Sequence, residues 1–135
     1  MDLDSLRRLC LEWPGATERV QWEALVFKVL DKIFAIAALE PEAVWLTIKS
    51  TPEEFYELVE RPGVVPAPYL ARAKWVALES PTALPDFEIK QLVRRSYDLV
   101  VEKLPARSRA KLTSGQPAPR RRKSARPKRT RKSRR

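Results

Sequence analysis

The 135-residue chain contains no histidine, one cysteine and three glycines. Without histidine, it lacks the usual acid–base group of neutral pH, the partner that activates serine and cysteine nucleophiles, and a common zinc and iron ligand. The single Cys10 excludes a disulfide within the chain and, in an apolar helical pattern, indicates a buried thiol in a reducing compartment. Three glycines leave no glycine-rich phosphate loop. We therefore expect a non-enzymatic protein with no catalytic residue, no cofactor and no metal site.

Long hydrophobic runs are also missing. No stretch approaches the roughly 18 apolar residues that suggest a membrane-spanning helix, and no signal-peptide core follows the first residues. We therefore expect a cytoplasmic protein without a membrane partner, a location that is compatible with association with the nucleoid. No motif indicates a particular protein partner.

Acidic residues are absent from the last thirty positions. Residues 106–135 contain fourteen Lys and Arg and no Asp or Glu, whereas residues 1–105 contain thirteen basic and seventeen acidic residues, a net charge of −4. The total charge of +10 therefore belongs to the end of the chain. Because Pro, Ser, Arg and Lys dominate there and apolar residues almost vanish, we expect a domain at 1–105 and a disordered tail at 106–135.

The tail carries most of its charge in its last sixteen residues, RRRKSARPKRTRKSRR. Such a polycation is typical of binding to DNA phosphates by counterion release, which is largely independent of sequence. RNA remains an alternative, but residues 106–135 contain no aromatic residue on which the bases of a single strand could stack. Binding to anionic membranes and a merely solubilising role are the other interpretations. The residues expected to contact nucleic acid are Arg120, Arg121, Arg122, Lys123, Arg126, Lys128, Arg129, Arg131, Lys132, Arg134 and Arg135.

The hydrophobic pattern of the first 105 residues predicts an α+β fold, a twisted antiparallel sheet packed with helices. Apolar residues recur at helical spacing in three segments that end at proline: 2–13, 52–60 and 85–104. Four segments have a β pattern, the first two forming a hairpin around Asp31-Lys32: 25–30, 33–39, 44–50 and 74–79. Thr51 is the expected N-cap of the second helix, and the prolines at 66 and 68 exclude a central strand there.

Five basic residues of the domain form a second candidate contact surface for nucleic acid: Lys28, Lys32, Lys49, Arg72 and Lys74. The alternative is that they are ordinary outward-facing residues, since lysine at strand edges discourages aggregation. Because the domain as a whole is acidic, any contact surface on it must be local.

The aromatic residues could form a stacking platform, but most are expected in the core, with Trp75 of interest because it follows a basic loop. They are Trp22, Phe27, Phe34, Trp45, Tyr69, Trp75 and Tyr97. The second helix carries four glutamates that are typical of a solvated face: Glu53, Glu54, Glu57 and Glu60.

Several spaced motifs resemble the MmcQ/YjbR family of small bacterial proteins. They are WPG at 13–15, ALVFKVLDKIFA at 24–35, YLARAKWVALE at 69–79 and SYDLVVEKLP at 96–105. The resemblance covers residues 1–105 and implies a CyaY-like α+β fold with an inferred DNA-binding role associated with double-wing loops. Where the family typically has Asn-Lys-Lys-His-Trp, this chain has Ala-Arg-Ala-Lys-Trp at 71–75, which retains positive charge at Arg72 and Lys74.

Together these features predict a DNA-binding protein in which the tail supplies most of the affinity. The alternative is an interaction module, in which the domain binds a protein or a small ligand and the tail tethers it to DNA or RNA.

Overall fold

The structure is a computed structural model and describes residues 1–40 and 43–114. The predicted nucleic-acid contacts from Arg120 to Arg135 lie outside the described residues. The chain divides into two units, Met1–Lys103 and Leu104–Arg135, and each is described by itself.

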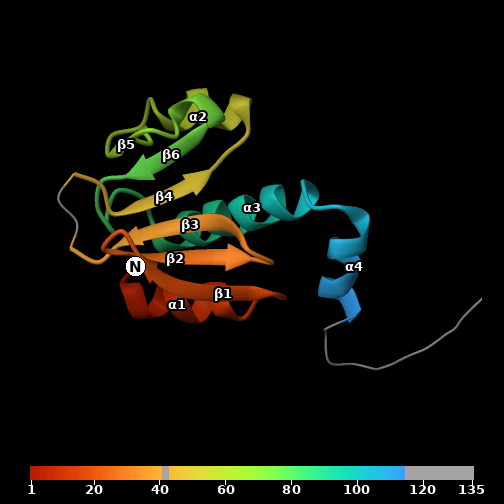
Figure 1. Ribbon diagram of the computed structural model, residues 1–135. Helices are drawn as coiled ribbons and strands as arrows, with labels where there is room; N and C mark the ends of the chain where they lie inside the picture. The colour runs from red at the N-terminus through yellow and green to blue at the C-terminus, as the bar shows by residue number, and fades with distance from the viewer. Residues whose placement is uncertain (41–42, 115–135) are drawn as a thin grey trace, which may run out of the picture. The chain divides into compact units, whose positions relative to one another are not determined.

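The first unit is built on a six-stranded sheet in the order β1-β2-β3-β4-β6-β5 (Figure 1). Its strands are β1 (Ala16–Gln21), β2 (Ala24–Val29), β3 (Lys32–Ala38), β4 (Leu46–Lys49), β5 (Val64–Pro66) and β6 (Trp75–Leu78). All neighbouring strands are antiparallel. Together with the helices described next, this confirms the predicted α+β class.

The helices of this unit are α1 (Leu3–Leu11), α2 (Pro52–Leu58) and α3 (Asp86–Glu102), together with the short 3₁₀ helix η1 (Ala71–Ala73). Helix α3 packs mainly on β3 and β4, α1 packs on β1 and α3, and α2 packs on β5 and β6. Figure 1 shows α3 running along one face of the sheet behind its central strands. Most of the apolar core therefore lies between the sheet and α1 and α3.

Two tight turns connect the first three strands. The turn residues Trp22 and Glu23 have φ of 53° and 60°, and Leu30 and Asp31 have φ of 48° and 71°. Two-residue loops with both residues in the left-handed region match the right-handed twist of the strands. The predicted hairpin is therefore present, with its turn one residue earlier than expected. Strand β1 was not predicted, because it is an edge strand whose exposed and half-buried residues give no clear apolar alternation.

Local sequence signals also fix the ends of α2 and the position of β5. The Thr51 hydroxyl accepts from the Glu54 N–H at 3.1 Å, and the Glu54 carboxylate accepts from the Thr51 N–H at 3.3 Å. This capping box confirms the predicted N-cap. The helix ends at Leu58, two residues before the predicted end. Strand β5 lies at the edge of the sheet. Pro66 has no backbone N–H to donate, and an edge strand tolerates this because it pairs with a neighbour on one side only.

The Ser96 side chain joins α3 to the two central strands. Its hydroxyl donates to the Phe34 carbonyl at 2.6 Å and accepts from the Lys49 N–H at 2.9 Å. These two backbone groups belong to the next residues along the ladder beyond the last β3–β4 pair, Ala35 with Ile48. Ser96 is fully buried. One hydroxyl therefore satisfies both a donor and an acceptor where water cannot do so.

Three aromatic rings surround the junction of α1, α3 and β3. The ring centroids of Trp13, Phe34 and Tyr97 lie 5.3 to 5.9 Å apart. The Tyr97 hydroxyl donates to the Pro14 carbonyl at 2.5 Å. The WPG segment that ends the first helix is thus held to α3 by both ring packing and a hydrogen bond.

The second unit contains a helix that corrects the expected start of the disordered tail. Helix α4 covers Ala106–Ser114, residues that the sequence analysis placed in the tail. Its sequence ARSRAKLTS has no glycine or proline and is rich in Ala, Arg, Lys and Leu, which have high helix propensity. The Arg109 guanidinium donates to the Leu104 carbonyl at 2.7 Å, adding a bond at the start of the helix. Charge density alone was therefore a poor guide to disorder at these positions.

Replacing Ser96 with alanine is expected to lower the free energy of unfolding by about 2–4 kcal/mol, because a buried N–H and a buried C=O lose their partner. Urea unfolding followed by circular dichroism measures this change. Ser80→Ala is the matched control, since its hydroxyl bonds only to Thr82 at an exposed turn. Equal midpoints for the two variants would contradict the role of Ser96.

Candidate functional site

The antiparallel register brings the five predicted basic residues of the domain to one end of the sheet. Strands β2 and β4 end there and β3 and β6 begin there, as the pairs Val29 with Lys32 and Lys49 with Trp75 show. Lys28 and Lys32 flank the β2–β3 turn, and Arg72 and Lys74 precede β6. Residues that are far apart in sequence therefore share one edge of the fold.

Two of these five residues, Lys49 and Lys74, line one groove, which we call the lysine groove. It has a volume of about 370 Å³. Lys103, which the sequence analysis did not single out, adds a third cation. The lining residues are Lys49, Ser50, Thr51, Pro52, Ala73, Lys74, Leu99, Glu102 and Lys103. Lys28, Lys32 and Arg72 do not line the groove, so the structure does not gather the five into one site.

Lys74 is held in place through its own backbone. It has φ of 67° after η1, and its carbonyl accepts from both the Ser50 hydroxyl at 2.7 Å and the Ser50 N–H at 3.0 Å. A residue other than glycine in this left-handed region is uncommon and needs such support. The two bonds fix the backbone of Lys74 against the end of β4.

The ammonium groups of the two lysines lie on aromatic rings. The Lys74 Nζ lies 5.2 Å from the Phe55 ring centroid and 5.0 Å from that of Tyr56, and it donates to the Tyr56 hydroxyl at 3.1 Å. The Lys49 Nζ lies 5.9 Å from the Trp75 centroid. Both contacts are of the cation–π type, which orients a cation without cancelling its charge. Trp75, singled out because it follows the basic loop, thus contacts a cation from the neighbouring strand.

The aromatic residues divide between core and surface. Phe27, Phe34, Trp45 and Tyr97 are buried as expected, and Trp75 is half-buried. Trp22 and Tyr69 are corrections to the expected core, because they are 70% and 103% exposed. Both sit at positive φ in tight turns, where the chain reverses and the side chain projects outward.

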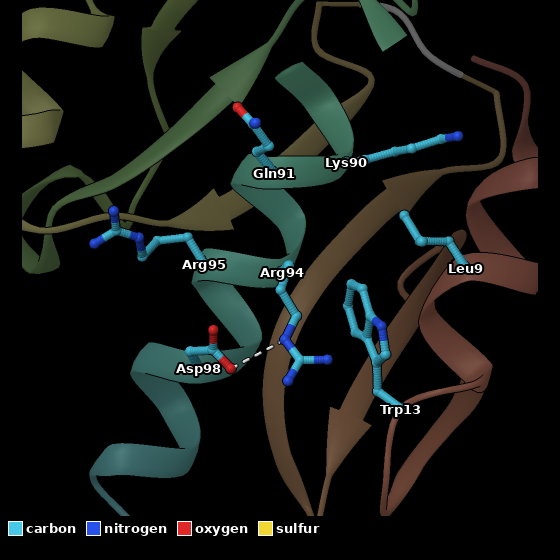
Figure 2. Close-up of a pocket in the computed structure, with 7 residues that line it drawn as sticks. All are labelled: Leu9, Trp13, Lys90, Gln91, Arg94, Arg95 and Asp98. Atoms are coloured by element: carbon cyan, nitrogen blue, oxygen red, sulfur yellow. Dashed lines mark hydrogen bonds and ion pairs between the residues drawn. The ribbon is translucent and has the colours of Figure 1, made fainter. Parts of the chain in front are cut away.

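A second groove lies between α1 and α3, and sequence reasoning missed it. We call it the α1–α3 groove; its volume is about 460 Å³. Its lining residues are Leu9, Trp13, Lys90, Gln91, Arg94, Arg95 and Asp98. The available signal was the spacing of Lys90, Arg94 and Arg95, which places cations on successive turns of one helix. Figure 2 shows Lys90 and Arg94 extending toward the side of Leu9 and Trp13, while Arg95 points to the opposite side of α3.

Arg94 is the most firmly positioned cation of this groove. Its guanidinium carbon lies 5.2 Å from the Trp13 centroid and 5.0 Å from the Tyr97 centroid, and its Nε donates to Asp98 at 3.1 Å. Arg95 instead pairs with Glu54 at 3.0 Å. Among the lining residues, Lys90 and Arg94 therefore supply the positive charge on the side of the groove where Leu9 and Trp13 lie, which we call its open side.

The chain matches known proteins over most of its domain. A family model described as YjbR matches residues 11–99. The chain belongs to the YjbR family. It is 32% identical over 113 residues to the uncharacterized protein YjbR of Escherichia coli strain K12, and equally to that of strain O157:H7, with 81% of this chain and 95% of theirs covered.

A solved structure of the family has the same fold. The crystal structure of Deinococcus radiodurans protein DR2400, described with the domain DUF419, superposes with a TM-score of 0.74 and 31% identity. The match covers 82% of this chain and 87% of that protein. The YjbR match contains Trp13 and the basic positions of α3, whereas residues 100–135 lie beyond it. The basic tail is therefore an addition to the part that defines the family.

In residues 1–40 and 43–114, no group of three or more Asp, Glu, Cys or His side chains is arranged to hold a metal ion. Within the same residues, no helix is long and apolar enough to cross a membrane. Cys10 is buried, as predicted. Burial raises the pKa of its thiol to about 12, and the nearby Glu18 carboxylate adds to this shift.

The Cys10 thiol is expected to react with Ellman's reagent at least about a hundredfold more slowly than free cysteine at neutral pH, because it is both buried and protonated. In denaturing urea it should react quickly and with one equivalent. The absorbance of the released thiolate measures both rates. Rapid labelling of the native protein would show that the thiol is accessible.

Proposed function

We propose that this YjbR-family protein is a non-enzymatic DNA-binding protein whose basic tail supplies most of the affinity. The observation that carries the proposal is the division of charge, −4 over residues 1–105 and +14 over residues 106–135. The cations that supply net attraction to phosphates are therefore concentrated at one end of the chain. The absence of histidine supports the non-enzymatic part of the proposal.

The domain would contribute a smaller and more local contact. Lys49 and Lys74 lie in one groove, and neither pairs with a carboxylate within the described residues. Lys103, the last residue of the first unit, adds a third cation to the lining of this groove. The DNA-binding role and double-wing loops implied by the MmcQ/YjbR resemblance point the same way. Cytoplasmic location, with association with the nucleoid, follows as part of the proposal.

Removing the tail's charge is expected to abolish most duplex binding and its salt dependence. The eleven Lys and Arg of residues 120–135 permit a slope of up to about −10 in a plot of log K against log salt concentration, at about −0.9 per phosphate neutralised. A variant ending at Ser114 retains α4, and a full-length variant with these eleven residues changed to glutamine keeps the tail's length. Fluorescence anisotropy with a short labelled duplex, between about 50 and about 200 mM salt, measures the slope.

The two variants should agree with each other and lose affinity by about a thousandfold or more at the low-salt end. Affinity and slope equal to those of the intact chain would refute the tail as the source of binding. The same titration with an RNA duplex tests the RNA alternative, since tighter RNA binding at every salt concentration would change the assigned partner.

The lysine groove has its own test in the full-length protein. Changing Lys49 and Lys74 together to glutamine is expected to reduce the salt slope by about 2 and to weaken binding evenly across DNA sequences. A matched control changes Arg8 and Arg19, two exposed cations outside the groove, to glutamine and alters the net charge equally. If both double variants weaken binding to the same extent, the groove has no specific role and only net charge matters.

A further inference from the structure

We propose that the α1–α3 groove is a binding site for a small aromatic carboxylate, with its ring on Leu9 and Trp13 and its carboxylate against Arg94 and Lys90. This site is independent of the proposed DNA binding, because it lies on the domain and uses different residues. It also gives a specific form to the alternative in which the domain binds a small ligand.

The groove has the size and lining that such a ligand needs. Its volume of about 460 Å³ lies within the roughly 300–1,000 Å³ of small-molecule sites. Leu9 and Trp13 form an apolar side, and Lys90 and Arg94 bring cations to the same opening (Figure 2). Neither an uncharged ring nor a small inorganic anion would use both halves. A ligand that joins a planar ring to one negative charge would use both.

Arg94 is prepared for this role by its surroundings. The rings of Trp13 and Tyr97 and the Asp98 carboxylate hold its guanidinium in place. Of the three guanidinium nitrogens, the Nε is the one that donates to Asp98. Within the described residues, its two terminal nitrogens have no hydrogen-bond partner, which leaves the paired donors that a carboxylate accepts. Because the side chain is already ordered, binding costs little conformational entropy.

The charge balance favours a ligand with a single negative charge. Asp98 offsets one of the two cations on the open side, and Arg95 is engaged with Glu54. A net charge of about +1 remains for the ligand, so a multiply charged phosphate would leave part of its charge unmatched. An inorganic ion would also make no use of the apolar side formed by Leu9 and Trp13. These features together distinguish the groove from a general phosphate site.

Binding of 2-naphthoate to the full-length protein tests the proposal. The indole N–H signal of Trp13, assigned by its loss in Trp13→Phe, should shift on titration with a dissociation constant of about 1 mM or below, as is typical of ligands of this size. Two comparison compounds separate ring from charge: 2-naphthalenemethanol lacks the carboxylate and acetate lacks the ring. Each should bind at least about tenfold more weakly. Because Trp13 reports locally, weak association of the anion with the tail does not affect this signal.

Variants then test the assigned residues. Arg94→Gln and Lys90→Gln should each weaken naphthoate binding by about tenfold and leave 2-naphthalenemethanol unaffected. Arg8→Gln, on α1 but outside the groove, should change neither. Lys90 is exposed, so its variant remains informative even if Arg94→Gln unfolds the protein. Equal affinity for naphthoate and the alcohol, an unchanged affinity in Lys90→Gln, or no shift at Trp13 would each overturn the proposal.

Discussion

The hydroxyl of Ser96 satisfies one backbone group from each of two central strands, and the orientation of α3 depends on it. Beyond the pair of Ala35 and Ile48, the carbonyl of Phe34 and the N–H of Lys49 both turn to this side chain. A buried polar group without a partner would cost about 1–3 kcal/mol. The helix must therefore present residue 96 to the sheet at a fixed height and rotation. That constraint also sets where Arg94, Tyr97 and Asp98 lie, since they belong to the same turns.

The consequences of this anchor extend to both grooves. Tyr97, one residue after the anchor, contacts Trp13 and bonds to the Pro14 carbonyl, so it fixes the end of α1. Arg94 then lies between two rings at the edge of the α1–α3 groove. The N–H that donates to Ser96 belongs to Lys49, which lines the lysine groove. Helix α3 thus influences the geometry of both surfaces.

The sequence predicted the elements whose signals are local. Thr51 with Glu54, the prolines at 85 and 105, and the apolar runs of β2 and β3 each act within a few residues, and the structure contains the corresponding elements. Strand β1 could not be recognised, because its stability comes from pairing with β2 and from Arg7, which bonds to Glu18. Helix α4 does have a local signal, its favourable helix propensity, but the high positive charge of the segment led to a prediction of disorder instead.

The candidate sites were predictable only as residue types. Sequence reasoning grouped Lys49 and Lys74 with Lys28, Lys32 and Arg72 on one candidate surface, and it gave no reason to separate the two that line the lysine groove from the three that do not. Whether two cations share a groove depends on register between strands that are separated by helices and loops, and no local pattern encodes that register. The contact of Arg94 with Trp13 likewise joins residues more than eighty positions apart, so only the packing of α3 on α1 reveals it.

Pairing with rings rather than carboxylates explains how an acidic domain can still present positive surfaces. Arg7, Arg61 and Arg95 each pair with a glutamate, and those pairs cancel most of the charge that they bring. Lys49 and Lys74 lie instead on Trp75 and on the Phe55 and Tyr56 rings. A ring quadrupole attracts a cation but carries no net charge, so the field of the ammonium group still reaches an approaching anion. The net charge of −4 over residues 1–105 therefore does not describe the field at the grooves. Because such fields fall off over about 10 Å at moderate salt, each groove acts on an anion that is already close, whereas a chain segment of charge +14 acts by raising the local concentration of the polyanion.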